Sequence, residues 1–119
     1  MSVEEINKKL YQFDSIYKPE TITSKPDQKQ NRSFAQKLLN IKFRVLEKYI
    51  DKNKRLLNLS CGNGIHDIML APRVREIVGV DFSDRFLLYA KSLKKKKKIK
   101  NFNFIKSSFE KLRVKDNSF

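Results

Sequence analysis

A short apolar stretch that stops at a glycine-containing turn constrains this chain more than any other feature. Arg55–Leu59 reads RLLNL, and the next five residues read SCGNG. Apolar residues then recur at Ile65, Ile68 and Met69, up to Pro72. This spacing predicts one or two turns of helix that the proline ends. A strand followed directly by a glycine-rich turn and a helix is typical of nucleotide-binding α/β sheets.

The sequence that follows repeats this alternation of strand and helix. Glu76–Asp81 reads EIVGVD, a β-rich stretch that ends on an acid, and Ser83 has a side chain suited to an N-cap. Apolar residues then recur at helical spacing: Phe86, Leu87, Ala90 and Leu93. A third strand is predicted over residues 102–105. The order strand, helix, strand, helix, strand (βαβαβ) predicts an α/β fold with parallel strands, as in half of a doubly wound sheet.

Two helices are expected ahead of the sheet. Residues 1–31 form a polar N-terminal segment, in which Ile6, Leu10 and Phe13 indicate a short amphipathic helix. A longer helix is predicted over about residues 33–50, with Ser33 as its N-cap. Its expected buried face recurs every three or four residues: Phe34, Leu38, Ile41, Val45 and Tyr49. We therefore divide the chain into a polar segment, 1–31, and a domain, 32–119.

Half of the net charge comes from one lysine-rich run. The chain of 119 residues has 27 basic and 13 acidic side chains, and residues 91–100 hold seven lysines and no acid, against a net charge of +14. Such a run binds nucleic-acid phosphates, or it forms the solvated end of a helix where cations complement the helix dipole. Lys94–Lys98 is therefore a candidate nucleic-acid surface, although no aromatic side chain interrupts the run as base stacking requires.

Composition excludes several other classes of protein. The single cysteine, Cys61, and the single histidine, His66, leave no disulfide framework and no metal site. No apolar run approaches the roughly 18 residues of a membrane-spanning helix, and the first ten residues lack the apolar segment of a secretory signal. We therefore expect a cytoplasmic protein in which Cys61 is a half-buried packing residue and His66 is structural or solvated.

The glycine-containing turn and the acid that ends the second strand form a candidate ligand site. Gly62 and Gly64 allow backbone to approach a ligand closely, and Asp81, 17 residues after Gly64, can accept hydrogen bonds from two ribose hydroxyls. A dinucleotide-binding fingerprint would have a third glycine where this chain has Asp67. The pattern favours a ligand with adenosine but no pyrophosphate; the alternative is a simple helix-entry turn beside a capping acid.

Four segments, in order along residues 55–119, resemble the class I S-adenosylmethionine-dependent methyltransferases, and most closely the small-molecule subgroup called methyltransferase type 11. Residues 57–64, LNLSCGNG, look like the family's first motif. Residues 78–83, VGVDFS, are similar to its second-strand motif. Residues 104–112, FIKSSFEKL, resemble the segment that flanks the adenine, and residues 116–119, DNSF, resemble the lead-in to the fourth strand.

The resemblance implies S-adenosyl-L-methionine as the cofactor and a Rossmann-like sheet as the fold. It places Gly62 and Gly64 against the methionine part of the cofactor and Asp81 on the ribose diol. It places Phe82 on one face of the adenine, with Ser108 and the backbone N–H of Phe109 at the adenine edge.

Three positions differ from the family pattern. Asn58 stands where an acid orders the methionine amino group, Ser60 replaces a glycine, and Ser108 replaces an aspartate. Each difference is expected to weaken cofactor binding, because an amide attracts an ammonium less than a carboxylate does and a Cβ at position 60 costs strain or room.

The resemblance covers only the first part of the family's fold. We expect a sheet that is truncated before its fourth strand, which leaves the first strand as an exposed apolar edge open to association. The family's catalytic groups lie beyond this point, so no catalytic residue is assigned and the chain alone is expected to be inactive. The expected function is a truncated methyltransferase domain with a small-molecule acceptor. The alternatives are a basic nucleic-acid-binding module, an RNA methyltransferase fragment and a non-catalytic remnant.

Overall fold

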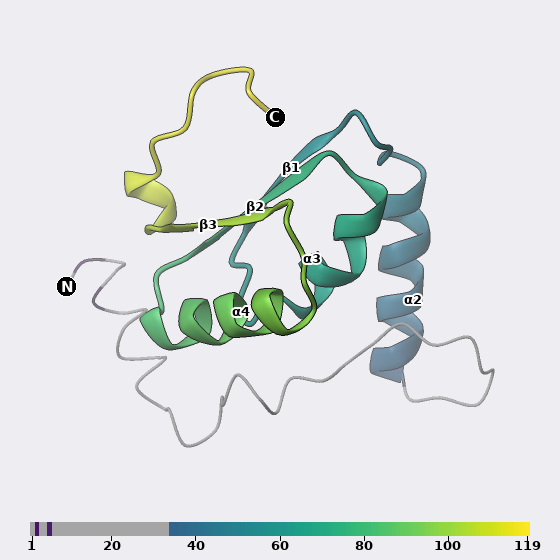
Figure 1. The fold of residues 1–119 in the computed structure, drawn as a ribbon, viewed down its shortest axis with the longest axis horizontal. Helices are drawn as coiled ribbons and strands as arrows, with labels where there is room; N and C mark the ends of the chain where they lie inside the picture. Colours follow the sequence, from purple (N-terminus) through teal and green to yellow (C-terminus); the bar gives the residue numbers. More distant parts are fainter. Residues whose placement is uncertain (1, 3–4, 6–33) are drawn as a thin grey trace.

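The computed structural model describes residues 2, 5 and 34–119 of the chain (Figure 1). The helix predicted around Ile6, Leu10 and Phe13 and the Ser33 cap lie outside the described residues. The boundary between segment 1–31 and the domain that follows it therefore stays a prediction.

Three parallel strands form the sheet, in the order β1-β2-β3. They are β1 (Arg55–Leu59), β2 (Glu76–Asp81) and β3 (Phe102–Lys106). Helix α3 (Ile65–Leu70) connects β1 to β2, with Pro72 in the 3₁₀ turn that follows it, and α4 (Asp84–Lys96) connects β2 to β3. The predicted βαβαβ order and the parallel sheet are confirmed.

The core lies where the helices cover one face of the sheet. Ile77 of β2 and Phe102 of β3 are fully buried there, and Phe43 and Leu70 pack in the same cluster. The segment after β3 passes over the opposite side of the sheet (Figure 1). Because β2 is paired on both sides, all its residues after Glu76 are buried. The central strand therefore holds the core and ends directly in the candidate site.

Helix α2 (Phe34–Glu47) ends three residues before the predicted boundary. Its last residues tighten, because the N–H groups of Lys48 and Tyr49 bond to the carbonyls three residues earlier, those of Val45 and Leu46. The helix itself is confirmed, and it ends earlier because these two shorter-range hydrogen bonds replace the regular helical ones after Glu47.

The predicted buried face of α2 is wrong. Four of its members, Leu38, Ile41, Val45 and Tyr49, are between 47% and 73% exposed. The inward face instead consists of Phe43, which is buried, and partly buried neighbours at helical spacing, Leu39, Leu46 and Ile50. Both stripes have the spacing of an amphipathic helix, so periodicity alone could not choose between them. Contact decides: the Phe43 ring packs edge-on against His66 of α3, with centroids 5.6 Å apart.

Helix α4 begins at the cap that its sequence predicts. The Ser83 side chain accepts a hydrogen bond from the Phe86 N–H, and Phe86, Leu87 and Ala90 are buried. At the other end Lys98 takes a left-handed conformation, and the Ile99 N–H donates to the Lys94 carbonyl. This arrangement closes the last turn of a helix.

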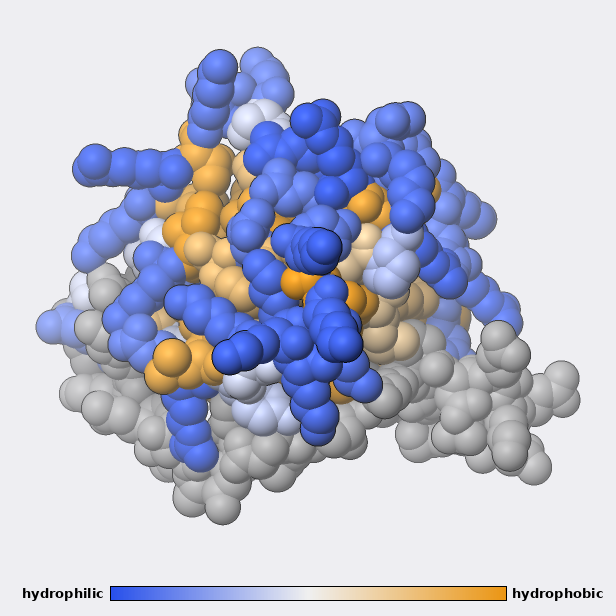
Figure 2. Space-filling model, viewed as in Figure 1, coloured by the Kyte–Doolittle hydropathy of each residue, from blue (hydrophilic) through white to orange (hydrophobic). Residues whose placement is uncertain are grey.

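The lysine run therefore forms the last turn of α4 and its cap. There the cations complement the helix dipole, and Figure 2 shows many hydrophilic side chains on the described part of the face in view. Nucleic-acid binding through Lys94–Lys98 stays a prediction. Within the described residues, no helix combines the length and the apolar character that a bilayer crossing needs.

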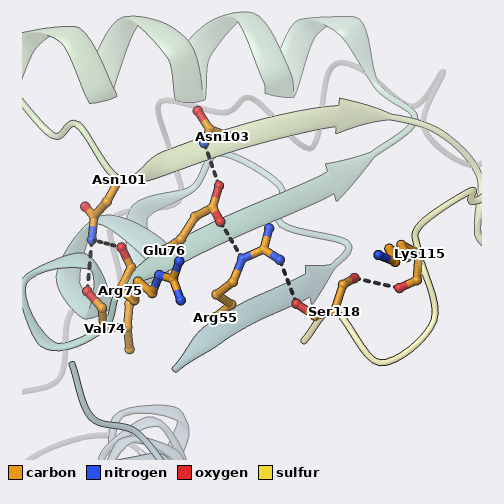
Figure 3. Close-up of polar contacts among 8 residues, drawn as sticks. All are labelled: Arg55, Val74, Arg75, Glu76, Asn101, Asn103, Lys115 and Ser118. Atoms are coloured by element: carbon orange, nitrogen blue, oxygen red, sulfur yellow. Dashed lines mark hydrogen bonds and ion pairs between the residues drawn. The ribbon is translucent and has the colours of Figure 1, made fainter. Parts of the chain in front are cut away.

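Polar contacts connect the amino-terminal ends of the strands, away from the candidate site (Figure 3). The Arg55 guanidinium donates to the Glu76 carboxylate at 2.6 Å, and the Asn103 amide donates to the same carboxylate at 2.9 Å. These two hydrogen bonds lower the pKa of Glu76. Arg55 also donates to the Ser118 carbonyl at 2.7 Å and lies over the Phe119 ring. The C-terminal residues therefore lie beside the first residue of β1. In the described part of the chain β1 pairs only with β2, so it is an edge strand, as expected.

Candidate functional site

The carboxyl ends of the three strands bring the predicted site residues to one edge of the sheet. The turn at residues 60–64 follows β1, residues 82–83 follow β2, and residues 107–109 follow β3. Parallel strands place such ends at the same edge, where open α/β sheets bind their ligands.

Asp81 connects all three of these segments. Its Oδ2 accepts a hydrogen bond from the Gly62 N–H at 2.9 Å, and its Oδ1 accepts one from the Ser83 N–H at 2.9 Å. Its backbone carbonyl accepts from the Ser107 N–H at 3.1 Å. The side chain is buried. A carboxylate offers about four lone-pair sites, two on each oxygen. Each Asp81 oxygen accepts one side-chain hydrogen bond here and can accept one more, so the carboxylate can bind the two hydroxyl groups of a diol.

The two glycines of the turn have different surroundings. Both are left-handed, with φ of +55° at Gly62 and +71° at Gly64. A Cβ on Gly62 would meet only Phe86, at 3.8 Å, whereas a Cβ on Gly64 would lie 2.8 Å from the Phe102 ring and 3.1 Å from Ala90. Gly62 therefore leaves backbone open to a ligand, while Gly64 is required by packing inside the domain.

Ser60 has a left-handed backbone as well, with φ of +63°. This is the position where the family has glycine, and the conformation explains the preference, because a left-handed residue with a Cβ costs about 1–2 kcal/mol. The Ser60 side chain is exposed. The strain expected from the sequence is therefore located in the backbone of the turn.

Replacing Ser60 by Gly is expected to raise the free energy of unfolding by about 1 kcal/mol, because it removes this backbone strain at the cost of some unfolded-state entropy. Thermal melting of the two proteins measures the difference, with Ser92→Gly in the exposed part of α4 as the opposite case, where glycine lowers stability. Equal melting temperatures for the Ser60 variant and the unmodified chain would contradict the assignment of strain.

Asn58 contacts a buried acid that the sequence did not identify as part of the site. The Asn58 Nδ2 donates to Oδ1 of Asp67 at 2.7 Å. Asp67 is 2% exposed, and its Oδ2 has no hydrogen-bond partner. Burial raises the pKa of Asp67 to about 6, against the opposing effect of the Asn58 hydrogen bond. One sequence signal could have shown this burial: Asp67 precedes the buried Leu70 by three residues and so shares its helix face.

The residues after β2 and β3 complete the edge. Phe82 is half-buried, and Phe109 is 55% exposed. The Ser108 Oγ is buried and has no hydrogen-bond partner. A buried hydroxyl without a partner is rare in folded proteins and indicates a missing one.

Cys61 is buried, more deeply than the half-buried position expected of it, and His66 packs inside the domain as a structural residue. Burial, followed by the charges of Asp67 and Asp81, raises the pKa of the Cys61 thiol to about 12, so the reactive thiolate is suppressed. His66 packs on Phe43. Among residues 2, 5 and 34–119 no group of His, Cys, Asp and Glu side chains could hold a metal ion.

Together the fold and the site define a Rossmann-like α/β domain whose glycine turn and acidic strand end meet at the carboxyl edge of a parallel sheet. A family model described as "Methyltransferase domain" matches residues 50–119. The chain therefore belongs to this methyltransferase family, as its motifs predicted.

Solved structures share this fold. The YcgJ protein from Bacillus subtilis is 25% identical with a TM-score of 0.61, over 66% of this chain and 34% of its own. A SAM-dependent methyltransferase from Aquifex aeolicus is 21% identical with a TM-score of 0.57, over 63% and 42%. The cyclase SpnF is 17% identical with a TM-score of 0.71, over 93% and 45%. The chain thus spans between 34% and 45% of these proteins. A comparison with curated proteins found no match.

Proposed function

We propose that this chain is the cofactor-binding part of an S-adenosyl-L-methionine-dependent methyltransferase that acts on a small molecule. The main support is the geometry of Asp81, which joins the glycine turn to the end of β2 and still has lone pairs for two hydroxyl donors. The resemblance to the type 11 methyltransferases supports the small-molecule acceptor.

The residues present fit this cofactor on three observations. Space is open beside the Gly62 backbone, Asp81 has unused acceptor capacity, and the buried Ser108 hydroxyl lacks a partner. Adenosine and its methionine substituent offer hydroxyl, amino and ring-nitrogen groups that match these features. The site is therefore suited to a nucleoside without requiring a phosphate-binding loop.

Each site residue has a binding or orienting role in this proposal. The cofactor, when bound, supplies a methyl group on a sulfonium, ready for in-line displacement. Gly62 and Gly64 form the turn that faces its methionine part, and Asp81 accepts the ribose hydroxyls. Phe82 packs on the adenine, with the Ser108 hydroxyl and the Phe109 N–H at the adenine edge. This chain's contribution to the reaction is to hold the methyl donor in one orientation.

Calorimetric titration with S-adenosylhomocysteine tests the proposal. We expect binding to the unmodified chain and a roughly tenfold to hundredfold loss of affinity in Asp81→Ala, because hydrogen bonds to a charged group contribute about 1.5–3 kcal/mol. Asp84→Ala is the matched control: it lies three residues away, its side chain is exposed, and it pairs with Lys106.

Thermal melting of both variants establishes that each is folded at the titration temperature. Lack of binding by the unmodified chain at millimolar ligand, or equal affinities for the unmodified and Asp81→Ala proteins, would show that the cofactor assignment is wrong.

A further inference from the structure

We propose that Asp67 supplies the negative charge that recognises the ammonium group of the cofactor, acting through the side-chain amide of Asn58. The charge that the family's motif has on the first strand is then provided in this chain from helix α3. This inference rests on the proposed function and adds a positioning residue to its site.

The orientation of the Asn58 amide carries the first step. Asn58 lies on β1, opposite Gly79 of β2, on the sheet face that the helices cover. Its Nδ2 donates to the Asp67 carboxylate at 2.7 Å. A carboxylate accepts and an amide nitrogen donates, so this contact fixes which end of the amide faces Asp67. The Asn58 Oδ1, which only accepts, is directed away from the carboxylate and is free to receive an ammonium N–H.

The burial of Asp67 carries the second step. The side chain is 2% exposed and one of its oxygens has no hydrogen-bond partner. Lys42 of α2 favours the ionised form of Asp67, and Asp67 in turn raises the pKa of the neighbouring Cys61 thiol, as Asp81 does. If Asp67 only anchored Asn58, a neutral acceptor would do so without burying a charge. A buried carboxylate with unused acceptor capacity is instead suited to a ligand that brings a positive charge.

The chemistry of the pair links the two steps. An amide that donates to a carboxylate has a more negative carbonyl oxygen, because hydrogen bonds in a chain polarise one another. Asn58 therefore transmits the charge of Asp67 to the carboxyl end of β1. The acid at position 67 then compensates for the amide at position 58, which is one of the three differences from the family pattern.

Two ligands that differ only in the amino group test this role. S-adenosylhomocysteine and its analogue with hydrogen in place of the α-amino group are titrated into the unmodified chain, Asp67→Asn, the double variant Asn58→Asp/Asp67→Asn, and Asp84→Asn as control. We expect the unmodified chain and the control to prefer the amino ligand by about tenfold. This corresponds to one charge-assisted hydrogen bond.

In Asp67→Asn the preference should fall below about twofold, and in the double variant it should return, because the acid is restored to the strand. A purely structural role would weaken both ligands equally, and this result would overturn the inference. A preference retained in Asp67→Asn, or absent from the unmodified chain while Asp81→Ala still weakens binding at least tenfold, would also overturn it but leave the proposed function intact. Failure of the unmodified chain to bind either ligand would contradict both.

Discussion

Replacing Asp67 by Asn is expected to raise the free energy of unfolding by about 3 kcal/mol at pH 7.5 and to leave it unchanged at pH 4. Burial raises the pKa of this carboxyl to about 6 from an ordinary value of 3.8. Each tenfold difference in proton affinity between the folded and unfolded states corresponds to about 1.4 kcal/mol. Ionised Asp67 therefore destabilises the fold at neutral pH, and an amide of the same shape does not.

The sign of the pH dependence follows from the raised pKa. Between about pH 4 and pH 6 the folded state binds more protons at Asp67 than the unfolded state does, so this group's contribution to stability rises as the pH falls through that range. The pKa of Glu76 is lowered, so its contribution to the free energy of unfolding has the opposite pH dependence. This contribution is the same in Asp67→Asn and in the unmodified chain, and it cancels when their free energies of unfolding are subtracted. Urea unfolding of Asp67→Asn and the unmodified chain across pH 4 to 7.5 measures that difference.

Asp84→Asn is the control for this experiment, because it removes an exposed carboxylate from the next helix. Parallel stability curves for Asp67→Asn and the unmodified chain would mean that Asp67 is not a buried charge. The expected result has a functional meaning under the role proposed for Asp67: the substitution expected to weaken recognition of the ammonium group is the one that stabilises the domain. Such opposition between stability and activity is common where a site retains an unfavourable group.

Replacing Gly64 by Ala is expected to lower the free energy of unfolding by about 3 kcal/mol. About 1 kcal/mol comes from a left-handed backbone with a Cβ, and about 2 kcal/mol comes from overpacking. The new Cβ would lie 2.8 Å from the ring of Phe102. Phe102 is fully buried and cannot move aside.

Gly62→Ala is the matched control, since it introduces the same atom into the same backbone conformation two residues earlier with no close neighbour. Thermal melting should show a loss of about 1 kcal/mol for Gly62→Ala and about three times as much for Gly64→Ala. Combining Gly64→Ala with Phe102→Leu should cost less than the sum of the two single substitutions, because the smaller side chain makes room. Equal losses at the two glycines would contradict this packing role of Gly64.

The parts of the fold set by strong local patterns could be predicted from the sequence. The apolar stretch before the glycine turn, the acid at the end of β2 and the Ser83 cap each have a local physical cause, and the parallel sheet follows from their order. The gathering of Asp81 with the turn at Gly62 was predictable for the same reason, because parallel strands end at one edge.

What could not be predicted depended on contacts between segments. Helix α2 has two apolar stripes, and only packing against α3 and the sheet selects the one that contains Phe43. The sequence singled out Asp67 only because it stands where a dinucleotide-binding fingerprint has glycine. Its burial could not be predicted from its charge, since charged side chains are usually exposed. Glycine is required by packing at position 64 but not at position 62, because the Phe102 ring lies against Gly64 only. Phe102 is 38 residues further along the chain, so local sequence could not show this contact.

The contact between Arg55 and Ser118 has a consequence for the order in which the domain assembles. It joins residues 63 apart, whereas the Arg55–Glu76 contact joins residues 21 apart. Closing the longer loop directly from the unfolded chain costs about 1 kcal/mol more in entropy. Pairing of β1 with β2 and of β2 with β3 removes most of that cost, because once the sheet has formed only residues 107–117 separate the end of β3 from Ser118. We therefore expect Arg55 to acquire its second partner late in folding, after the sheet has formed.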